Sequence, residues 1–177
     1  AVCTPDFSTY TDFPKAVHFF VDDYQFNRLW TNPDAYLDML RRFKAVCTPD
    51  FSTYTDFPKA VQIWNHYRKH WLGAYWQGNG ITVIPTISWS DESSFEWCFD
   101  GEPVGGAVAV SSVGTQLNKR AAELFRLGYD EMLRRLNPST IYFYGLVPEG
   151  ISGPIVHVAA FQEQIKARTT KPKESVV

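Results

Sequence analysis

The sequence lacks the features that mark several large protein classes. Its 177 residues include only three cysteines (Cys3, Cys47 and Cys98) and no Cys-x-x-Cys pair. We therefore predict neither a disulfide framework nor a cysteine-based zinc site. No apolar run approaches the roughly 18 residues of a membrane-spanning helix, and the first residues do not form a signal-peptide pattern. These absences predict a cytoplasmic protein without a membrane partner.

The sequence also lacks a strong charge of one sign. Seventeen Lys and Arg residues nearly balance nineteen Asp and Glu residues, for a net charge of −2 at pH 7. No whole-molecule field is expected to recruit nucleic acid or an anionic membrane surface. The patterns GxGxxG, GxxxxGK[ST] and GxSxG are all absent, which argues against dinucleotide, P-loop and serine-hydrolase sites. Cys98 lies in an apolar stretch without a neighbouring base, so it is a poor candidate nucleophile.

An exact duplication is present instead. The segment AVCTPDFSTYTDFPKAV occupies residues 1–17 and occurs again at residues 45–61. Natural repeats diverge, and solenoids need several units to bury a core. We interpret residues 1–17 as a duplicated segment of artificial origin, with an extra strand beside the sheet as the alternative. Residues 18–163 are predicted to form a single α/β domain, and residues 164–177 a polar C-terminal tail.

Short apolar runs alternate with helical patterns along this domain. The predicted helices span residues 33–43, 58–76 and 117–136. The predicted strands span residues 17–23, 45–47, 81–89, 107–110, 140–144 and 155–161. Such alternation with short loops predicts parallel strands joined by right-handed helical crossovers. A partial β/α barrel is favoured over an open doubly wound sheet.

Polar residues follow these strands where each one ends. In both architectures the carboxyl ends of parallel strands share one edge, which is where such folds bind their ligands. Asp23, Asp50 and Asp91 are the predicted catalytic residues, because carboxylates in different environments divide acid and base roles. Asp22, Asp23 and Asp50 are also candidate oxygen ligands for a divalent cation. The predicted substrate-binding residues are Tyr54, Ser88, Trp89 and Ser111.

Each acid also has a purely structural explanation. Asp91 falls in the first turn of a short helix, where an acid stabilises the helix dipole. Asp50 follows Pro49, and Pro-Asp is a common turn pair.

The predicted helix 58–76 carries His66 and His70 four residues apart. A metallopeptidase helix places Glu beside its first His, but Tyr67 stands there, so this zinc motif is not met. Arg68 and Lys69, with nearby tryptophans, instead suggest a basic aromatic surface for nucleic acid. The alternative is a half-buried helix with a solvated basic face.

Four blocks carry a family resemblance. They read HFFVDDYQFNRLWTNPDAYLDMLRRF, TPDFSTYTDFPKAVQIWN, IPTISWSDESSFEWCFDG and AVAVSSVG. Together they resemble an uncharacterised family of phage, prophage and mobile-element proteins with a domain of unknown function, over about residues 17–145. The resemblance implies a cytosolic protein of a bacterium or phage. It supplies no established activity and no catalytic residue.

The acidic edge favours a hydrolase or transferase acting on a phosphorylated or nucleotide-like substrate. The alternative is a non-catalytic module that binds a host protein or nucleic acid. Glycoside hydrolysis is a third hypothesis, because it requires a pair of carboxyl groups.

Overall fold

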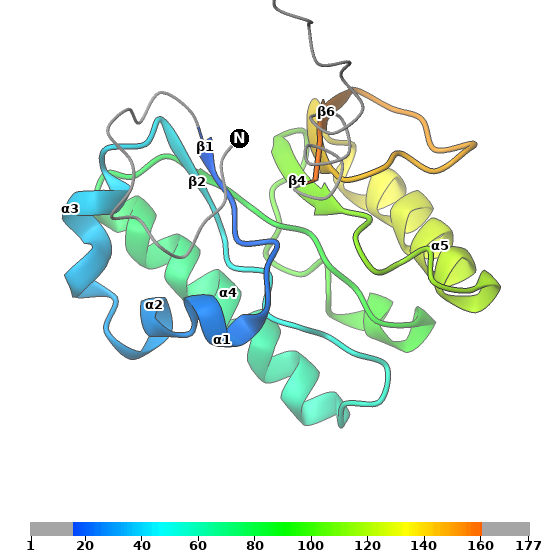
Figure 1. Cartoon of the computed structure of the whole chain (residues 1–177), viewed down its shortest axis with the longest axis horizontal. Coiled ribbons are helices and arrows are strands. Elements are labelled where there is room, and N and C mark those ends of the chain that lie inside the picture. The colour runs from blue at the N-terminus through cyan, green and yellow to red at the C-terminus, as the bar shows by residue number, and fades with distance from the viewer. Residues whose placement is uncertain (1–15, 161–177) are drawn as a thin grey trace, which may run out of the picture.

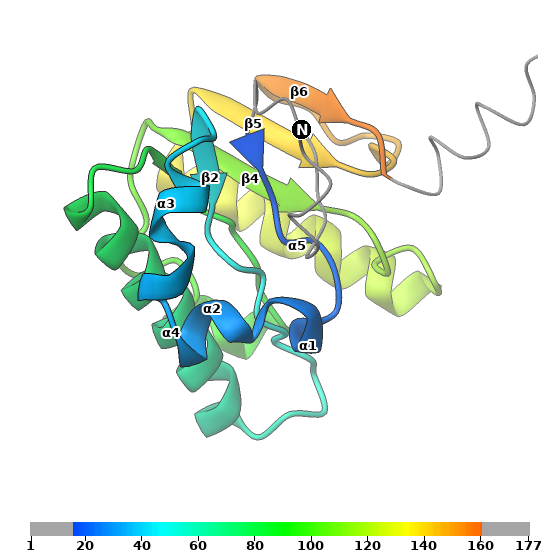
Figure 2. The same ribbon diagram turned by 60° about the vertical axis from the view of Figure 1, so that its left-hand side comes forward.

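The computed structural model describes residues 16–160 and contains two small parallel sheets (Figures 1 and 2). The first sheet holds β1 (Ala16–Val17), β2 (Ala45–Cys47) and β3 (Val83–Ile84), in that order. The second holds β4 (Ala107–Ser111), β5 (Thr140–Tyr144) and β6 (Ile155–Val158). The predicted α/β class with parallel strands is therefore confirmed.

A single bridge joins the two sheets. Thr86 pairs with Ala109 in parallel, and two backbone hydrogen bonds of 2.8 Å flank the pair, from Ile87 N to Ala109 O and from Ala109 N to Pro85 O. The strand predicted at residues 81–89 is interrupted here because Pro85 has no N–H for the ladder. The six strands thus follow one another in chain order. Within residues 16–160, β1 pairs only with β2 and β6 only with β5, so no closed barrel is formed.

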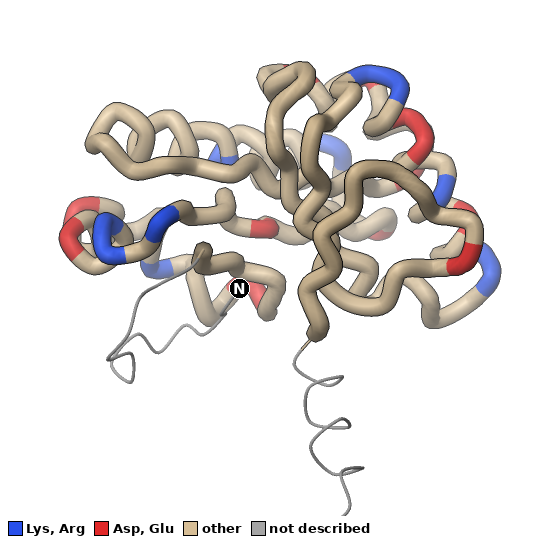
Figure 3. Tube along the Cα trace, turned by 90° about the horizontal axis from the view of Figure 1, so that it is seen from above, with Lys and Arg blue, Asp and Glu red and all other residues tan. Residues whose placement is uncertain are grey.

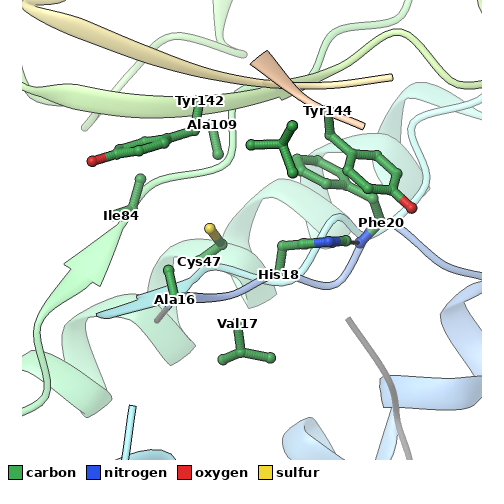
Figure 4. A pocket seen from close by; sticks show the side chains of 10 residues that line it. Ala16, Val17, His18, Phe20, Cys47, Ile84, Ala109, Tyr142 and Tyr144 are labelled. Carbon is green, nitrogen blue, oxygen red and sulfur yellow. Dashed lines mark hydrogen bonds between the residues drawn. The ribbon is translucent and has the colours of Figure 1, made fainter. Parts of the chain in front are cut away.

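The strands of the two sheets share one mainly apolar side. A small cavity of about 30 Å³ is lined from all six strands or the residues that follow them (Figure 4). His18 and Phe20, which follow β1, lie 4.3 Å and 5.2 Å between ring centroids from Tyr144 of β5. Side chains of the two sheets therefore meet across this space.

Two long helices cover the sheets. In Figure 1, α4 (Lys59–Gly78) lies with the first sheet and α5 (Lys119–Leu136) with the second. Each sheet has its own buried cluster, which includes Trp76 of α4 at the first sheet and Phe125 of α5 at the second. The remaining helical elements are the short α1 (Asp23–Phe26), α2 (Arg28–Thr31), η2 (Asp34–Tyr36), α3 (Leu37–Leu40) and η3 (Glu92–Glu96). None of the helices between residues 16 and 160 has the length and apolar character needed to span a membrane.

The first part of the chain differs most from the sequence-based boundaries. The strand predicted at residues 17–23 ends after Val17, and Asp23 already belongs to α1. The helix predicted at residues 33–43 is divided into η2 and α3, since the backbone tightens through a 3₁₀ turn after Pro33.

The duplicated segment shows how context selects local structure. Its last two residues are Ala16–Val17 in the first copy and Ala60–Val61 in the second. The first pair forms β1, which is paired with Ala45 and Val46 of β2. The second pair lies in the first turn of α4, where Val61 N donates to Pro58 O. Residues 1–15 and the predicted tail at 164–177 lie outside the described residues.

Candidate functional site

A cleft of about 650 Å³ lies at the carboxyl ends of the first four strands. Its walls are the segments that follow β1, β2, β3 and β4, together with the first half of α5. Such a volume suits a small-molecule ligand. Six of the predicted site residues line this cleft, namely Asp22, Asp50, Tyr54, Ser88, Trp89 and Ser111. Asp23 and Asp91 are not in its lining.

The pKa of the Asp50 carboxyl group in the cleft is shifted by its surroundings. Burial raises the pKa of Asp50 to about 6, and the negative charge of Asp23 acts in the same direction. The positive charge of Lys69 and a hydrogen bond with Ser88 oppose this rise in the pKa. A carboxyl group that titrates near neutral pH can both accept and donate a proton under physiological conditions. Asp50 therefore has the property expected of a general acid–base.

Asp23 forms hydrogen bonds with the loop after β2 and does not line the cleft. Its carboxylate accepts hydrogen bonds from Ser52 Oγ at 2.8 Å and from Ser52 N at 3.1 Å. Asn65 Nδ2 of α4 in turn donates to Ser52 O at 2.6 Å, and Arg68 donates to Asn65 Oδ1 at 2.5 Å. The same guanidinium lies 3.9 Å from the centre of the Phe51 ring. This network ties the loop after β2 to α1 and α4.

Asp91 caps the short helix η3. Its carboxylate accepts from Ser93 N at 3.0 Å and from Ser93 Oγ at 2.7 Å. The first of these contacts satisfies one of the free N–H groups of a helix start. The geometry thus matches the structural explanation of this residue.

Trp89 forms a fixed wall of the cleft. Its Nε1–H donates to Leu124 O at 3.1 Å, and its ring packs 5.4 Å from that of Phe125. It also crosses α5 at Gly128, where a Cβ would lie only 2.1 Å from Trp89 Nε1. A glycine is therefore required at this helix position. Tyr54, by contrast, is exposed at the rim.

The three aspartates predicted to bind metal do not form one compact group of ligands. Among residues 16–160, the one group of three potential His, Cys, Asp or Glu ligands is His66, His70 and Glu102. The described lining of the cleft also contains no Lys or Arg. A divalent cation at Asp22, Asp23 and Asp50 stays a prediction.

The sequence predicts that Lys69 lies on a basic surface of the helix, and this prediction is wrong. Lys69 is 2% exposed, and its Nζ lies 2.8 Å from Thr86 O and 2.9 Å from Glu102 Oε1. Trp76 is also fully buried. The helical spacing of the sequence indicates the burial of Lys69, because this residue falls on the buried stripe of α4. The other residues of this stripe are Gln62, Asn65, Leu72 and Trp76. Glu102 carries no comparable signal and was missed.

Comparisons with known proteins place this chain among phage sequences. Residues 12–162 match the family model described as "Domain of unknown function (DUF4417)". The "Gene 1 protein" of Mycobacterium phage L5 is 48% identical over 130 residues, which cover 73% of this chain and 57% of that protein. The "Gene 1 protein" of Mycobacterium phage D29 is 45% identical over 130 residues, with 73% and 48% covered. The matched region thus spans about half the length of these curated relatives. No solved structure matches the chain significantly.

Proposed function

The chain belongs to the DUF4417 family, and we propose that its cleft is the active site of a hydrolase or transferase for a nucleotide-like small molecule. In this proposal Asp50 is the general acid–base. The observation that carries the proposal is the raised pKa of Asp50, about 6, in a cleft at the strand ends. Altered pKa values of this kind are typical of catalytic groups.

The rest of the lining suits a hydroxyl-bearing ring compound. Hydroxyl side chains can donate to or accept from ribose or base atoms. Those in the lining are Ser52, Thr53, Thr55, Ser88, Ser90, Ser111 and Thr115. Trp89 and Tyr54 offer aromatic faces for stacking. Because the described lining lacks Lys and Arg, we expect the neutral part of the substrate, rather than its phosphate, to bind in the cleft.

The proposed roles separate the three predicted catalytic acids. Asp50 exchanges the proton, and Ser88 hydrogen-bonds to its carboxyl group. Asp23 positions the loop after β2 through Ser52. Asp91 holds η3 in place by capping it. Asp22 is the second acid of the lining, and a glycoside hydrolase would need it as the partner of Asp50.

The test is turnover by the wild-type protein and two matched variants. Nucleosides, nucleotides and nucleotide sugars are incubated with wild type, Asp50→Asn and Asp56→Asn, and products are separated by chromatography. We expect Asp50→Asn to lower turnover about 100-fold or more, and the wild-type rate to change with a pKa near 6. Asp56 lies on the same loop but is exposed, so its variant should keep full turnover. Equal turnover by wild type and Asp50→Asn would overturn the proposal.

A second candidate function rests on exposed aromatic side chains. Trp64, Tyr67 and Trp71 of α4 are each more than one-third exposed, and all three contact Trp30 of α2 edge-to-face. Such rings can stack on the bases of single-stranded nucleic acid or pack against a host protein. The surrounding charge does not favour nucleic acid, since Lys69 is buried and acidic and basic residues are interspersed along the trace (Figure 3).

This candidate is tested by binding rather than turnover. Fluorescence anisotropy with labelled single-stranded DNA should show weaker binding for Trp64→Ala and Trp71→Ala than for wild type. Unchanged affinity in both variants would remove the aromatic surface from the interaction.

The fold and the cellular setting also belong to this proposal. The contacts of His18 and Phe20 with Tyr144 support a sheet that curls like an incomplete barrel. The phage relatives support action inside an infected or lysogenic bacterium, in its cytoplasm.

A further inference from the structure

A second group of potential metal ligands lies outside the lining of the cleft, and two of its three members belong to α4. His66 and His70 stand on successive turns of the helix, with ring centroids 4.3 Å apart. Glu102 comes from the loop after η3, and its Oε1 lies 3.0 Å from His70 Nε2. One nitrogen from each imidazole and one carboxylate oxygen all lie within 4.8 Å of one another.

The three side chains supply ligand atoms that divalent transition metals use in proteins, namely two imidazole nitrogens and one carboxylate oxygen. His66 and His70 are half-buried, whereas Glu102 is buried.

The residues around the three side chains restrict their positions. His66 Nε2 lies 3.3 Å from Asp100 O, a contact that restrains the orientation of the ring. Gly101 has a φ of +76°, and a Cβ there would approach His70 Cε1 to 3.3 Å. The loop thus passes closely over the imidazole. His70 Nε2 and Glu102 Oε1 are buried 3.0 Å apart, and neither atom has a hydrogen-bond partner among residues 16–160.

We propose that His66, His70 and Glu102 bind a divalent transition-metal ion, with Zn²⁺ as the best match. Two imidazoles and one carboxylate form a donor set that Zn²⁺ uses in proteins, with a fourth position left for water. The ion would connect α4 to the loop at residues 100–102. The Lys69 ammonium, 2.9 Å from Glu102 Oε1, opposes a second cation. We therefore expect micromolar affinity rather than the much tighter binding of an isolated structural zinc site.

Metal titration of the purified chain tests this site. After treatment with a chelator and its removal, Zn²⁺ alone is titrated into the wild type and followed by calorimetry. We expect one ion per chain, and at least tenfold weaker binding for His66→Ala and His70→Ala. His157→Ala is the matched control, since His157 lies on β6 at the other end of the strand order and should bind Zn²⁺ like wild type.

A spectroscopic measurement keeps the test independent of folding effects. On addition of Zn²⁺, the imidazole NMR signals of His66 and His70 should shift while those of His18 and His157 stay in place. The proposal is overturned if wild type binds no Zn²⁺, if both alanine variants bind it unchanged, or if other imidazoles shift instead. None of these readouts depends on the activity proposed for Asp50.

Discussion

Asp50 and Glu102 are two carboxyl groups that have lost solvent contact and interact electrostatically with Lys69. Their pKa values nevertheless shift in opposite directions. Burial dominates at Asp50 and raises its pKa to about 6. At Glu102, burial is outweighed by Lys69 and His70, and the pKa is lowered. The difference lies in direct contact, because Lys69 Nζ and His70 Nε2 are 2.9 Å and 3.0 Å from Glu102 Oε1.

The comparison shows that cationic side chains in direct contact, more than burial, decide whether a desolvated carboxyl group stays ionised. An acid with ion partners at contact distance holds the fold together, whereas one with few partners is left free for proton transfer. Glu102 thus belongs to the supporting structure of α4, and Asp50 to the cleft.

The largest expected effect comes from removing the ion partner at Glu102. Glu102→Ala leaves the Lys69 ammonium buried beside a neutral side chain, and such a loss typically costs about 3–5 kcal/mol. Urea denaturation followed by circular dichroism measures the free energy of unfolding. Glu96→Ala is the control, because its pair with Lys59 is exposed and should leave stability almost unchanged. Similar small losses in both variants would show that the buried pair does not stabilise the fold.

Substitution of Asp50 is expected to raise the free energy of unfolding, whereas substitution of Glu102 lowers it. Its pKa is about 6 in the folded chain, against an ordinary value of 3.8, so folding disfavours the ionised form. Between about pH 4 and pH 6 the folded state binds more protons, and wild-type stability falls as the pH rises. Asp50→Asn removes this cost and should stabilise the chain by about 1–3 kcal/mol at pH 7, with no gain below about pH 4.

The same denaturation series checks this prediction at several pH values. Asp56→Asn serves as the reference, since that exposed side chain should show no comparable gain. A loss of stability in Asp50→Asn at pH 7 would mean that the carboxylate is held ionised, as at Glu102.

The effect of His66 on stability should depend on pH in the direction opposite to that of Asp50, so that stability falls as the pH falls. Its pKa falls from the ordinary value of 6.5 to about 3 in the folded chain, so the unfolded chain binds the extra proton first. Its contribution to stability is present above pH 6.5 and is lost as the pH falls from there toward 3. With chelator present, wild type should lose about 1 kcal/mol more than His66→Gln between pH 7 and about pH 5.5. Identical slopes for the two chains would contradict a neutral His66 in the folded chain.

Much of this arrangement was accessible from local sequence patterns. The helices α4 and α5 follow from long periodic segments with clear ends, and the parallel direction of the strands follows from their alternation with helices. Asp50 was predicted at the shared edge of the strands because it lies three residues after the last residue of β2, and it lines the cleft there.

Other features depend on tertiary context. Glu102 meets His70 only because the loop after η3 returns across α4, and no spacing in the sequence encodes that path. Likewise, the same Ala-Val pair forms a strand at Ala16–Val17 and a helix at Ala60–Val61. Such a dipeptide is too short for its own propensity to prevail over its surroundings.

The smallest expected effect tests the single hydrogen bond that Ser88 provides to Asp50. This bond lowers the pKa of Asp50 against the effect of burial, so Ser88→Ala should raise that pKa further. A net hydrogen bond of about 1 kcal/mol limits the rise to less than about one pH unit. NMR titration of the Asp50 carboxyl carbon measures it, with Ser111→Ala, another hydroxyl of the cleft lining, as the control. A lowered pKa in Ser88→Ala would mean that water replaces the hydroxyl, and that solvent access rather than partner number separates Asp50 from Glu102.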